Sequence, residues 1–210
     1  TVVIEGGEEV GGLCILRGCM PTKALLYASD VLHLVRSAGT WGIRVGKAGF
    51  DFTKVMERKD AMVKDFADYR HGQLSDGRFR FIRAHAHFLD PNQLQLSNGE
   101  RITARNFVIS TGSTIAPSPL PHLKEIGCLT SDTALSLKKL PKSLIVLGGG
   151  PVAVEFAQFF ARFDVKVTLI QRSEHLLRDF DVDASREIEK VFKREGITVY
   201  SCTQLVDAFR

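Results

Sequence analysis

The last third of the chain alternates between strand-like and helix-like patterns, and this alternation constrains the fold more than any other feature. Three short apolar runs are separated by two longer stretches in which apolar residues recur at helical spacing. In order, these five segments are residues 143–150, 151–163, 164–170, 181–196 and 197–201. Pro151 stands in the first turn of a helix, where proline is tolerated, and Gly196 follows the last helical residue. The order strand, helix, strand, helix, strand predicts an α/β class with a doubly wound parallel sheet.

A glycine-rich turn joins the first of these strands to the first helix. It fits the pattern G-x-G-x-x-A, and the residues of interest are Gly148, Gly150, Pro151, Val152 and Ala153. Gly148 suits a tight turn, Gly150 lets a pyrophosphate approach the backbone, and Ala153 lets helix and sheet pack closely. The positive end of the helix dipole would then face the phosphate charge. We therefore predict a dinucleotide site here in preference to an ordinary glycine turn.

The end of the second strand indicates which dinucleotide binds. NAD sites usually offer a carboxylate at this position for the ribose 2′-hydroxyl. In this chain Gln171 and Arg172 follow the strand, with Arg178 close behind. Two guanidinium groups suit a 2′-phosphate, so we predict NADPH rather than NADH. The alternative is that both arginines are solvated and that Glu174 binds the ribose.

Near the N-terminus, two cysteines stand five positions apart in the segment GGLCILRGCMPTKALL, residues 11–26. In a regular helix, Cα atoms five residues apart are about 8–9 Å from each other, whereas a disulfide needs them within about 7 Å. A bond between Cys14 and Cys19 therefore requires a distorted turn. The surrounding glycines and proline supply one, namely Gly11, Gly12, Gly18 and Pro21.

Three interpretations of this cysteine pair are open from the residues alone. A strained disulfide at a helix N-terminus is easily reduced, because the helix dipole stabilises a thiolate, and this favours a redox-active dithiol. The second interpretation is a pair of unbonded buried thiols, and the third is half of a metal site. The spacing C-x4-C is unusual for zinc, and the sequence holds no second Cys/His pair with ligand spacing. We therefore predict no metal site.

The remaining segments also have readable patterns. They predict a buried strand at residues 1–7, helices at 14–36 and 52–69, and strands between residues 78 and 113. The first strand ends at Glu5. Within the later strands we expect a turn at residues 97–99 and a buried strand at 106–110. The proline-bearing stretch 116–121 is typical of a linker.

Composition excludes several functional classes. The 210 residues are 44% hydrophobic with a net charge of +4, and no basic block is interleaved with aromatic residues, so we expect no nucleic-acid partner. We expect no membrane span and no signal peptide, because there is no apolar run of about 18 residues and no charged-then-apolar leader. Four cysteines are too few for a secreted disulfide scaffold. A redox dithiol fits a cytoplasmic location.

The segment GGLCILRGCMPTK, residues 11–23, resembles the active-site signature G-G-T-C-x-x-x-G-C-x-P-[ST]-K of class I pyridine nucleotide-disulfide oxidoreductases. This family includes dihydrolipoamide dehydrogenase, glutathione reductase and mercuric reductase. The order of Glu5, the signature and GGGPVAVE along the chain strengthens the resemblance. It implies two Rossmann-like, three-layer dinucleotide-binding domains, both partial. Residues 1–142 would bind FAD without the first strand and glycine loop, and residues 143–210 would form an NAD(P)-binding domain that is incomplete at its C-terminal end.

The resemblance also implies a role for each reactive residue. Cys14 and Cys19 would form a redox-active disulfide, with Cys19 stacked on the flavin and Cys14 attacking the substrate. Lys23 would lie near flavin N5 and pair with Glu155. The implied FAD-binding residues are Glu5, Gly11, Gly12, Lys23, Ala86, Thr111, Gly112 and Ser113. The implied NADPH-binding residues are Gly148, Gly150, Pro151, Val152, Ala153, Glu155, Arg172 and Arg178.

By this resemblance the protein is an FAD-dependent oxidoreductase. Hydride would pass from NADPH through FAD to the disulfide and on to a small-molecule disulfide or a metal-ion substrate, with lipoamide, low-molecular-weight disulfides and mercuric ion all open. The full-length protein would be a homodimer, and the present chain would be an incomplete part of it without turnover of its own. The alternative is a non-catalytic dinucleotide-binding module that senses redox state, or an inactive fragment.

Overall fold

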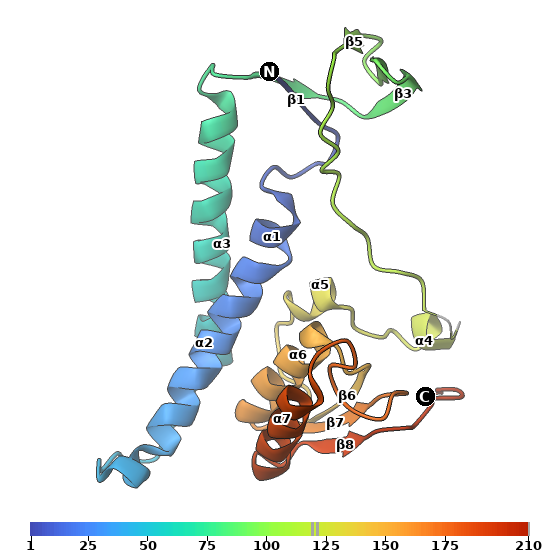
Figure 1. The fold of residues 1–210 in the computed structure, drawn as a ribbon. Helices are drawn as coiled ribbons and strands as arrows, with labels where there is room; N and C mark the ends of the chain where they lie inside the picture. Colours follow the sequence, from blue (N-terminus) through green and yellow to red (C-terminus); the bar gives the residue numbers. More distant parts are fainter. Residues whose placement is uncertain (119, 121, 210) are drawn as a thin grey trace. The chain divides into compact units, whose positions relative to one another are not determined.

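The computed structural model describes residues 1–118, 120 and 122–209 (Figure 1). Pro119 and Pro121, which belong to the expected linker, lie outside the described residues. The chain divides into two compact units, and each is described by itself. The first unit comprises Thr1–Met20 and Ala61–Thr114, and the second comprises Pro21–Asp60 and Ile115–Arg210. The domain boundary expected at residue 142 separates the FAD-binding part from the NAD(P)-binding part and does not coincide with these compact units. It stays a prediction.

The described residues form helices and short strands, which alternate regularly only in the last third of the chain. In order they are β1 (Val2–Glu5), α1 (Gly12–Leu16), α2 (Cys19–Arg36), the 3-10 helix η1 (Ala38–Trp41), α3 (Phe52–Ser75), β2 (Arg80–Arg83), β3 (Ala86–Asp90), β4 (Gln93–Leu96), β5 (Arg101–Thr103), α4 (His122–Glu125), α5 (Ser131–Ala134), β6 (Ser143–Leu147), α6 (Pro151–Arg162), β7 (Lys166–Ile170), α7 (Val182–Arg194) and β8 (Thr198–Tyr200). Among the described residues, none of these helices combines the length and apolar character needed to cross a bilayer.

The second unit contains the predicted β-α-β-α-β arrangement. Strands β6, β7 and β8 form a parallel sheet in that order, with Leu144 opposite Val167 and Leu169 opposite Val199. Figure 1 shows α6 and α7 on the same side of this sheet. Alternate strand residues face these helices and are covered, whereas Ile145 on the other face is 62% exposed. The predicted parallel α/β sheet is confirmed in this unit.

Five phenylalanines contribute to the buried core of the second unit. Phe159 and Phe160 of α6 are almost fully buried and pack edge to face, with ring centroids 5.0 Å apart. Helix α2 contributes Leu25 and Leu32 to the same core. Burial of a side chain of this size contributes about 1.5–3 kcal/mol, so the core holds α2 onto the C-terminal sheet.

Lys59 of α3 is an unusual member of the second unit because its side chain is only 6% exposed. Its ammonium donates a hydrogen bond of 2.6 Å to the backbone carbonyl of Leu135 and forms an ion pair with Asp60. A buried ammonium is tolerated only with such partners. Lys59 therefore connects α3 to the segment that follows α5.

The first unit has a smaller core. Strands β1 and β2 are parallel, with Ile4 opposite Ile82, and β3, β4 and β5 form an antiparallel sheet. The expected turn at 97–99 is confirmed, because Gly99 has a φ of 89° between β4 and β5. The buried apolar residues of this unit's core cluster are Ile82, Ala84, Leu94 and Leu96.

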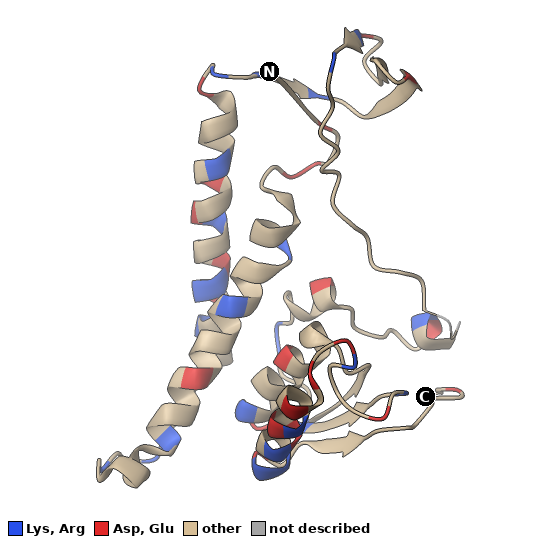
Figure 2. Ribbon diagram, viewed as in Figure 1, with Lys and Arg blue, Asp and Glu red and all other residues tan. Residues whose placement is uncertain are grey.

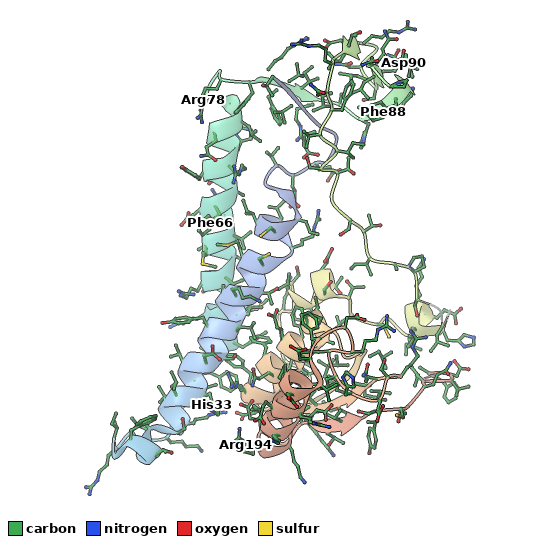
Figure 3. The ribbon with its side chains drawn as sticks, in the orientation of Figure 1. His33, Phe66, Arg78, Phe88, Asp90 and Arg194 are labelled. Atoms are coloured by element: carbon green, nitrogen blue, oxygen red, sulfur yellow. The ribbon has the colours of Figure 1, made fainter. Side chains whose placement is uncertain are left out.

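Helix α3 is longer than predicted. Charges of both signs are interspersed along the helix, as Figure 2 shows. Apolar residues recur at helical spacing along one stripe of α3, namely Val55, Met56, Met62, Val63, Phe66 and Tyr69. Met56 is buried, whereas Phe66 is 42% exposed and its side chain stands out from the helix in Figure 3. The stripe therefore packs only near the start of α3.

Two sequence expectations were wrong in detail. The helix expected at 14–36 is interrupted at Arg17 and Gly18, so α1 and α2 are separate helices. Residues 106–110 were expected to form a buried strand, but they are extended without pairing to any described strand, and Val108 is 92% exposed. Within this segment, the Phe107 ring packs edge to face on the Phe88 ring of β3, with ring centroids 5.1 Å apart. An apolar run forms a strand only where a neighbour completes its hydrogen bonds.

Candidate functional site

Cys14 and Cys19 come together at the junction of α1 and α2. Cys14 lies within α1, and Cys19 is the first residue of α2. Both are free, exposed thiols rather than the disulfide expected from the sequence. Their side chains are hydrogen-bonded to each other, which corresponds to a reduced dithiol.

Two opposing effects act on the Cys14 thiol. The hydrogen bond to the Cys19 side chain, followed by burial and the charge of Cys19, raises the pKa of Cys14 above its ordinary value. The backbone N–H groups of Cys19 and Met20 donate to the Cys14 sulfur and act in the opposite direction. These N–H groups belong to the first turn of α2, so the Cys14 sulfur faces the positive end of an 18-residue helix.

The glycines of this turn are needed for the close approach of the two cysteines. Gly12 has a φ of 76°, a conformation that side chains disfavour. At Gly18, an added Cβ would lie 3.0 Å from the carbonyl oxygen of Leu13 and 3.2 Å from the Cα of Cys14. Backbone atoms cannot rotate away, so only glycine permits this contact. The distorted turn predicted from the sequence is confirmed.

The turn between β6 and α6 leaves room for a ligand. Gly148 has a φ of 107° and donates its N–H to the carbonyl of Ile170 at 2.8 Å, which confirms the tight turn. Gly150 is the N-cap of α6 and Pro151 its first residue. No atom lies within 4 Å of a Cβ added at Gly148 or Gly150. Open space beside the glycines and the N-terminus of a 12-residue helix fit a pyrophosphate group.

Two residues near this turn, Gly149 and Ala157, have packing roles that the G-x-G-x-x-A motif does not indicate. A Cβ added at Gly149 would lie 2.8 Å from the Gln171 side chain and 2.9 Å from Leu176, so this glycine is required by the core. Ala157 is fully buried within α6, whereas Ala153 is only partly buried. The helical spacing of apolar residues in α6 is the sequence feature that could have predicted the burial of Ala157.

After β7, the Gln171 side chain is buried, whereas the side chains of Arg172 and Arg178 are exposed. Gln171 is 7% exposed, and its side-chain amide donates to the backbone carbonyl of His175. Arg178 is exposed and pairs with Asp179 at 3.3 Å. Arg172 is exposed and has no hydrogen bond or ion pair to any of the described residues. Both guanidinium groups are thus exposed to solvent in the segment that follows β7.

The predicted ion pair between Lys23 of α2 and Glu155 of α6 is confirmed. The Lys23 side chain is 59% exposed and the Glu155 side chain 31%. Lys23 lies four residues after Cys19, one turn further along α2 and on the same face of the helix. Cys19 and Lys23 of α2 and Glu155 of α6 therefore follow one another in the structure.

The residues expected to hold FAD, apart from Lys23, belong to the first unit. Glu5 ends β1, and its carboxylate accepts a hydrogen bond of 2.7 Å from the backbone N–H of Gly7. Ala86 begins β3 and is exposed. Thr111, Gly112 and Ser113 lie in exposed chain, with a φ of 74° at Gly112. A carboxylate at the end of a parallel strand and exposed glycine-containing chain fit a ribose and a second cofactor contact.

Among the described residues, no three His, Cys, Asp or Glu side chains lie close enough together to hold a metal ion.

Comparisons with known proteins identify the family of the chain. A family model described as pyridine nucleotide-disulphide oxidoreductase matches residues 1–209. The chain is 35% identical over 200 residues to mercuric reductase from Bacillus cereus, covering 95% of this chain and 31% of that protein. It is 33% identical over 211 residues to dihydrolipoyl dehydrogenase from Bacillus subtilis strain 168, covering 94% and 44%.

The fold resembles a solved flavoprotein. The structure of the Cu(II) complex of the HOCl-induced flavoprotein disulfide reductase RclA from Escherichia coli superposes with a TM-score of 0.83 at 26% identity. The match covers 98% of this chain and 44% of that one. The chain thus spans less than half the length of these three proteins, and the match supports the α/β fold with Rossmann-like domains.

Proposed function

Because the chain belongs to the pyridine nucleotide-disulphide oxidoreductase family, we propose that it is part of an FAD-dependent enzyme that carries electrons from NADPH to the Cys14–Cys19 pair. From there the electrons pass to a small-molecule disulfide or a metal ion. The observation that carries this proposal is the arrangement along α2, where a hydrogen-bonded thiol pair is followed by Lys23 in contact with Glu155 of α6. A thiol pair with a structural role alone has no use for a charged contact with the nucleotide-domain helix.

The cofactors supply what the side chains lack. When bound, FAD supplies two-electron transfer between a nicotinamide and a disulfide. Glu5, Ala86 and residues 111–113 would hold it in the first unit, and Gly148 and Gly150 would hold the pyrophosphate of the nucleotide. The protein's own residues would bind and orient the cofactors and the substrate, and the two cysteines would carry out thiol–disulfide exchange.

Thiol–disulfide exchange describes the substrate step. The Cys14 thiolate attacks one sulfur of the substrate disulfide, forms a mixed disulfide and releases the other sulfur as a thiolate. Cys19 then attacks the Cys14 sulfur, and the second substrate thiolate leaves. The Cys14–Cys19 disulfide has formed, and the substrate has gained two electrons. The α2 N–H groups at the Cys14 sulfur stabilise the thiolate that begins this sequence.

Lys23 provides a positive charge one turn from Cys19. Its ammonium would stabilise negative charge on FAD bound beside it, and the Glu155 carboxylate would balance this cation. The Lys23→Met variant should therefore slow flavin reduction by nucleotide more than it weakens nucleotide binding.

NADPH is the proposed nucleotide because Arg172 and Arg178 are exposed at the end of β7. The variant Arg172→Ala should raise the Kd for NADPH about tenfold, as expected when a charge-assisted hydrogen bond is lost, and leave that for NADH unchanged. A variant of Glu174 that weakens NADH binding would instead support the ribose contact of an NAD enzyme. A reducing compartment, the cytoplasm, suits the dithiol, and the proposed full-length assembly is a homodimer.

The test of the function is an anaerobic titration of the purified flavin-loaded protein with NADPH and then NADH, followed by visible absorbance. Bleaching of the flavin and a new long-wavelength band that depends on Cys19 would support the enzyme. A protein that binds nucleotide without changing its spectrum would instead be a non-catalytic redox-sensing module.

A further inference from the structure

Three ion pairs join α2 to α6 and the residues after it, namely Lys23–Glu155, Asp30–Arg162 and Arg36–Asp164. We call this set the α2–α6 seam. Residue numbers rise along both helices from one pair to the next, so the helices run parallel and begin at the same end. The first two pairs are seven residues apart on each helix, which corresponds to about 10.5 Å of helix rise.

Burial changes along the α2–α6 seam. The Lys23 and Glu155 side chains are 59% and 31% exposed, whereas the Arg162 side chain is only 13% exposed. Ion pairs in contact with solvent contribute little because water screens them and both side chains must be ordered. The Lys23–Glu155 pair therefore cannot by itself fix the position of α2 against α6.

Arg162 is the best-anchored residue of the seam. Its Nε and one terminal nitrogen donate to the two oxygens of Glu195 at 3.1 and 2.7 Å, and its other terminal nitrogen donates to Asp30. Gln158 donates to the same Glu195 carboxylate, at 3.2 Å from each oxygen. The Glu195 side chain is 12% exposed. A guanidinium held on two sides by a nearly buried carboxylate has one defined orientation, and this orientation presents it to α2.

Arg36 closes the end of the seam. Its guanidinium donates to both oxygens of Asp164 at 2.9 and 2.8 Å and to the backbone carbonyl of Arg162 at 3.0 Å. That carbonyl lies at the C-terminus of α6, where a positive charge is favourable. Asp164 itself has a φ of 64°. The last turn of α2 is therefore tied to the backbone of α6 as well as to its side chains.

We infer that Arg162 is a positioning residue that, through Asp30, sets the lengthwise register of α2 on α6 and so holds the Lys23 ammonium against Glu155. The inference rests on the proposed function for its catalytic meaning, since Lys23 is one turn from Cys19. Arg162 touches no reacting atom and acts two helical turns away from Lys23.

The variant Asp30→Asn is the most direct test. The Asp30 side chain is 53% exposed, so its replacement leaves no buried charge, and the Arg162–Glu195 contact is kept. Arg162→Lys is a second variant, because it keeps the positive charge but loses the bidentate contact with the Glu195 carboxylate. Asp183→Asn is the matched control, since Asp183 forms an exposed ion pair with Arg186 on α7 outside the seam.

The first measurement reports on geometry without the cofactor. In a background of Cys14→Ser and Cys19→Ser, the substitutions Lys23→Cys and Glu155→Cys are joined by a short bis-methanethiosulfonate reagent, and the linked peptide is quantified by mass spectrometry. We expect Asp30→Asn to lower the yield of this link at least about twofold, the scale of a lost surface contact, and Asp183→Asn to leave it unchanged.

The second measurement uses the flavin-loaded protein. We expect Asp30→Asn to slow flavin reduction by NADPH about tenfold, as small misplacements near reacting groups do, with an unchanged Kd for NADPH. In a Lys23→Met background the same substitution should cause no further loss, because Asp30 acts through Lys23. Arg162→Lys should lie between Asp30→Asn and the parent.

The outcomes distinguish a failure of the positioning role of Arg162 from a failure of the proposed function. An unchanged link yield in Asp30→Asn and Arg162→Lys would overturn the positioning role, as would an additive effect of Asp30→Asn in the Lys23→Met background. A reduced link yield in a protein whose flavin does not accept electrons from either nucleotide would support the register role and refute the proposed function.

Discussion

The two glycine turns, residues 11–18 and 148–150, look alike in sequence but use glycine for different reasons. In the first turn, a side chain at Gly18 would collide with backbone atoms of Leu13 and Cys14. In the second turn, a side chain at Gly148 or Gly150 would meet no atom within 4 Å. The first turn brings two parts of the chain together, and the second keeps a space open beside a helix N-terminus. The difference separates a glycine that allows two backbone segments to approach from glycines that, by our proposal, leave room for a ligand.

The largest expected effect comes from the thiol turn. In the full-length enzyme, the variant Cys14→Ser cannot form a mixed disulfide with substrate, so we expect NADPH-dependent reduction of dithiobis(nitrobenzoate) to fall at least about 1000-fold. The Kd for NADPH should stay the same, because the second turn is untouched. Turnover within about tenfold of the parent would show that the two turns do not serve one reaction.

Neighbouring glycines of the second turn should separate folding from binding. Gly149→Ala places a methyl group against Gln171 and Leu176, and we expect a loss of about 1–3 kcal/mol in the free energy of unfolding. Gly150→Ala has open space and a φ of −80°, so stability should change by less than about 0.5 kcal/mol. Its methyl group would nevertheless obstruct the pyrophosphate and weaken NADPH binding about tenfold.

Urea unfolding and nucleotide titration of both variants check this pair of expectations. Equal stability losses in the two variants would mean that the open space beside Gly150 is filled in solution, and the assignment of this glycine to the ligand would fail.

Gly18→Ala tests the packing role of the first turn. Because the neighbouring atoms belong to the backbone, we expect the free energy of unfolding to fall by about 1 kcal/mol and the Cys14–Cys19 disulfide to form more slowly with oxidised glutathione. Gly72→Ala is the control, since Gly72 lies inside α3 with no atom within 4 Å. Alanine there should stabilise the helix by about 0.5–1 kcal/mol. A loss at Gly72 or a gain at Gly18 would contradict the packing argument.

The smallest effect concerns the protonation of Cys14. Its pKa is raised chiefly by the hydrogen bond to the Cys19 side chain, so less thiolate is present at a given pH. Cys19→Ala removes that hydrogen bond and the neighbouring charge but keeps the α2 N–H groups. The pKa of Cys14 should therefore fall, and alkylation by iodoacetamide near pH 7.5 should become about two- to fivefold faster. The pH profile of alkylation measures this shift, and an unchanged or higher midpoint would rule out the hydrogen bond as its cause.

The sequence predicted the C-terminal sheet well because its evidence is local. The residues of β6, α6, β7, α7 and β8 carry their own periodicities, and the core they form is drawn largely from those residues. The thiol turn was also predictable, since a bond between Cys14 and Cys19 would require a distorted turn and Gly18 stands between them. Residues 106–110 show the opposite case, because an apolar run does not reveal whether a partner strand lies beside it.

The α2–α6 seam could not be predicted as a set of contacts. Asp30 and Arg162 are 132 positions apart, and Arg36 and Asp164 are 128 apart. Each of these residues reads in the sequence as an ordinary charge on a helix surface. The motif G-x-G-x-x-A likewise does not distinguish Gly149 from its neighbours, since only the position of the Gln171 side chain does so. The Lys23–Glu155 pair was expected because a family resemblance named both partners.

The enclosed ammonium of Lys59 makes this lysine a natural marker in covalent footprinting. Acylating reagents modify an amine only when it is accessible and unprotonated, and the Lys59 amine is held by the Leu135 carbonyl and Asp60. Lys64, one turn later on α3, has a side chain that is 73% exposed. Lys64 would be acylated in the intact protein, whereas acylation of Lys59 would begin only when α3 separates from the segment around Leu135. The ratio of the two modified peptides would thus time the local opening of the second unit.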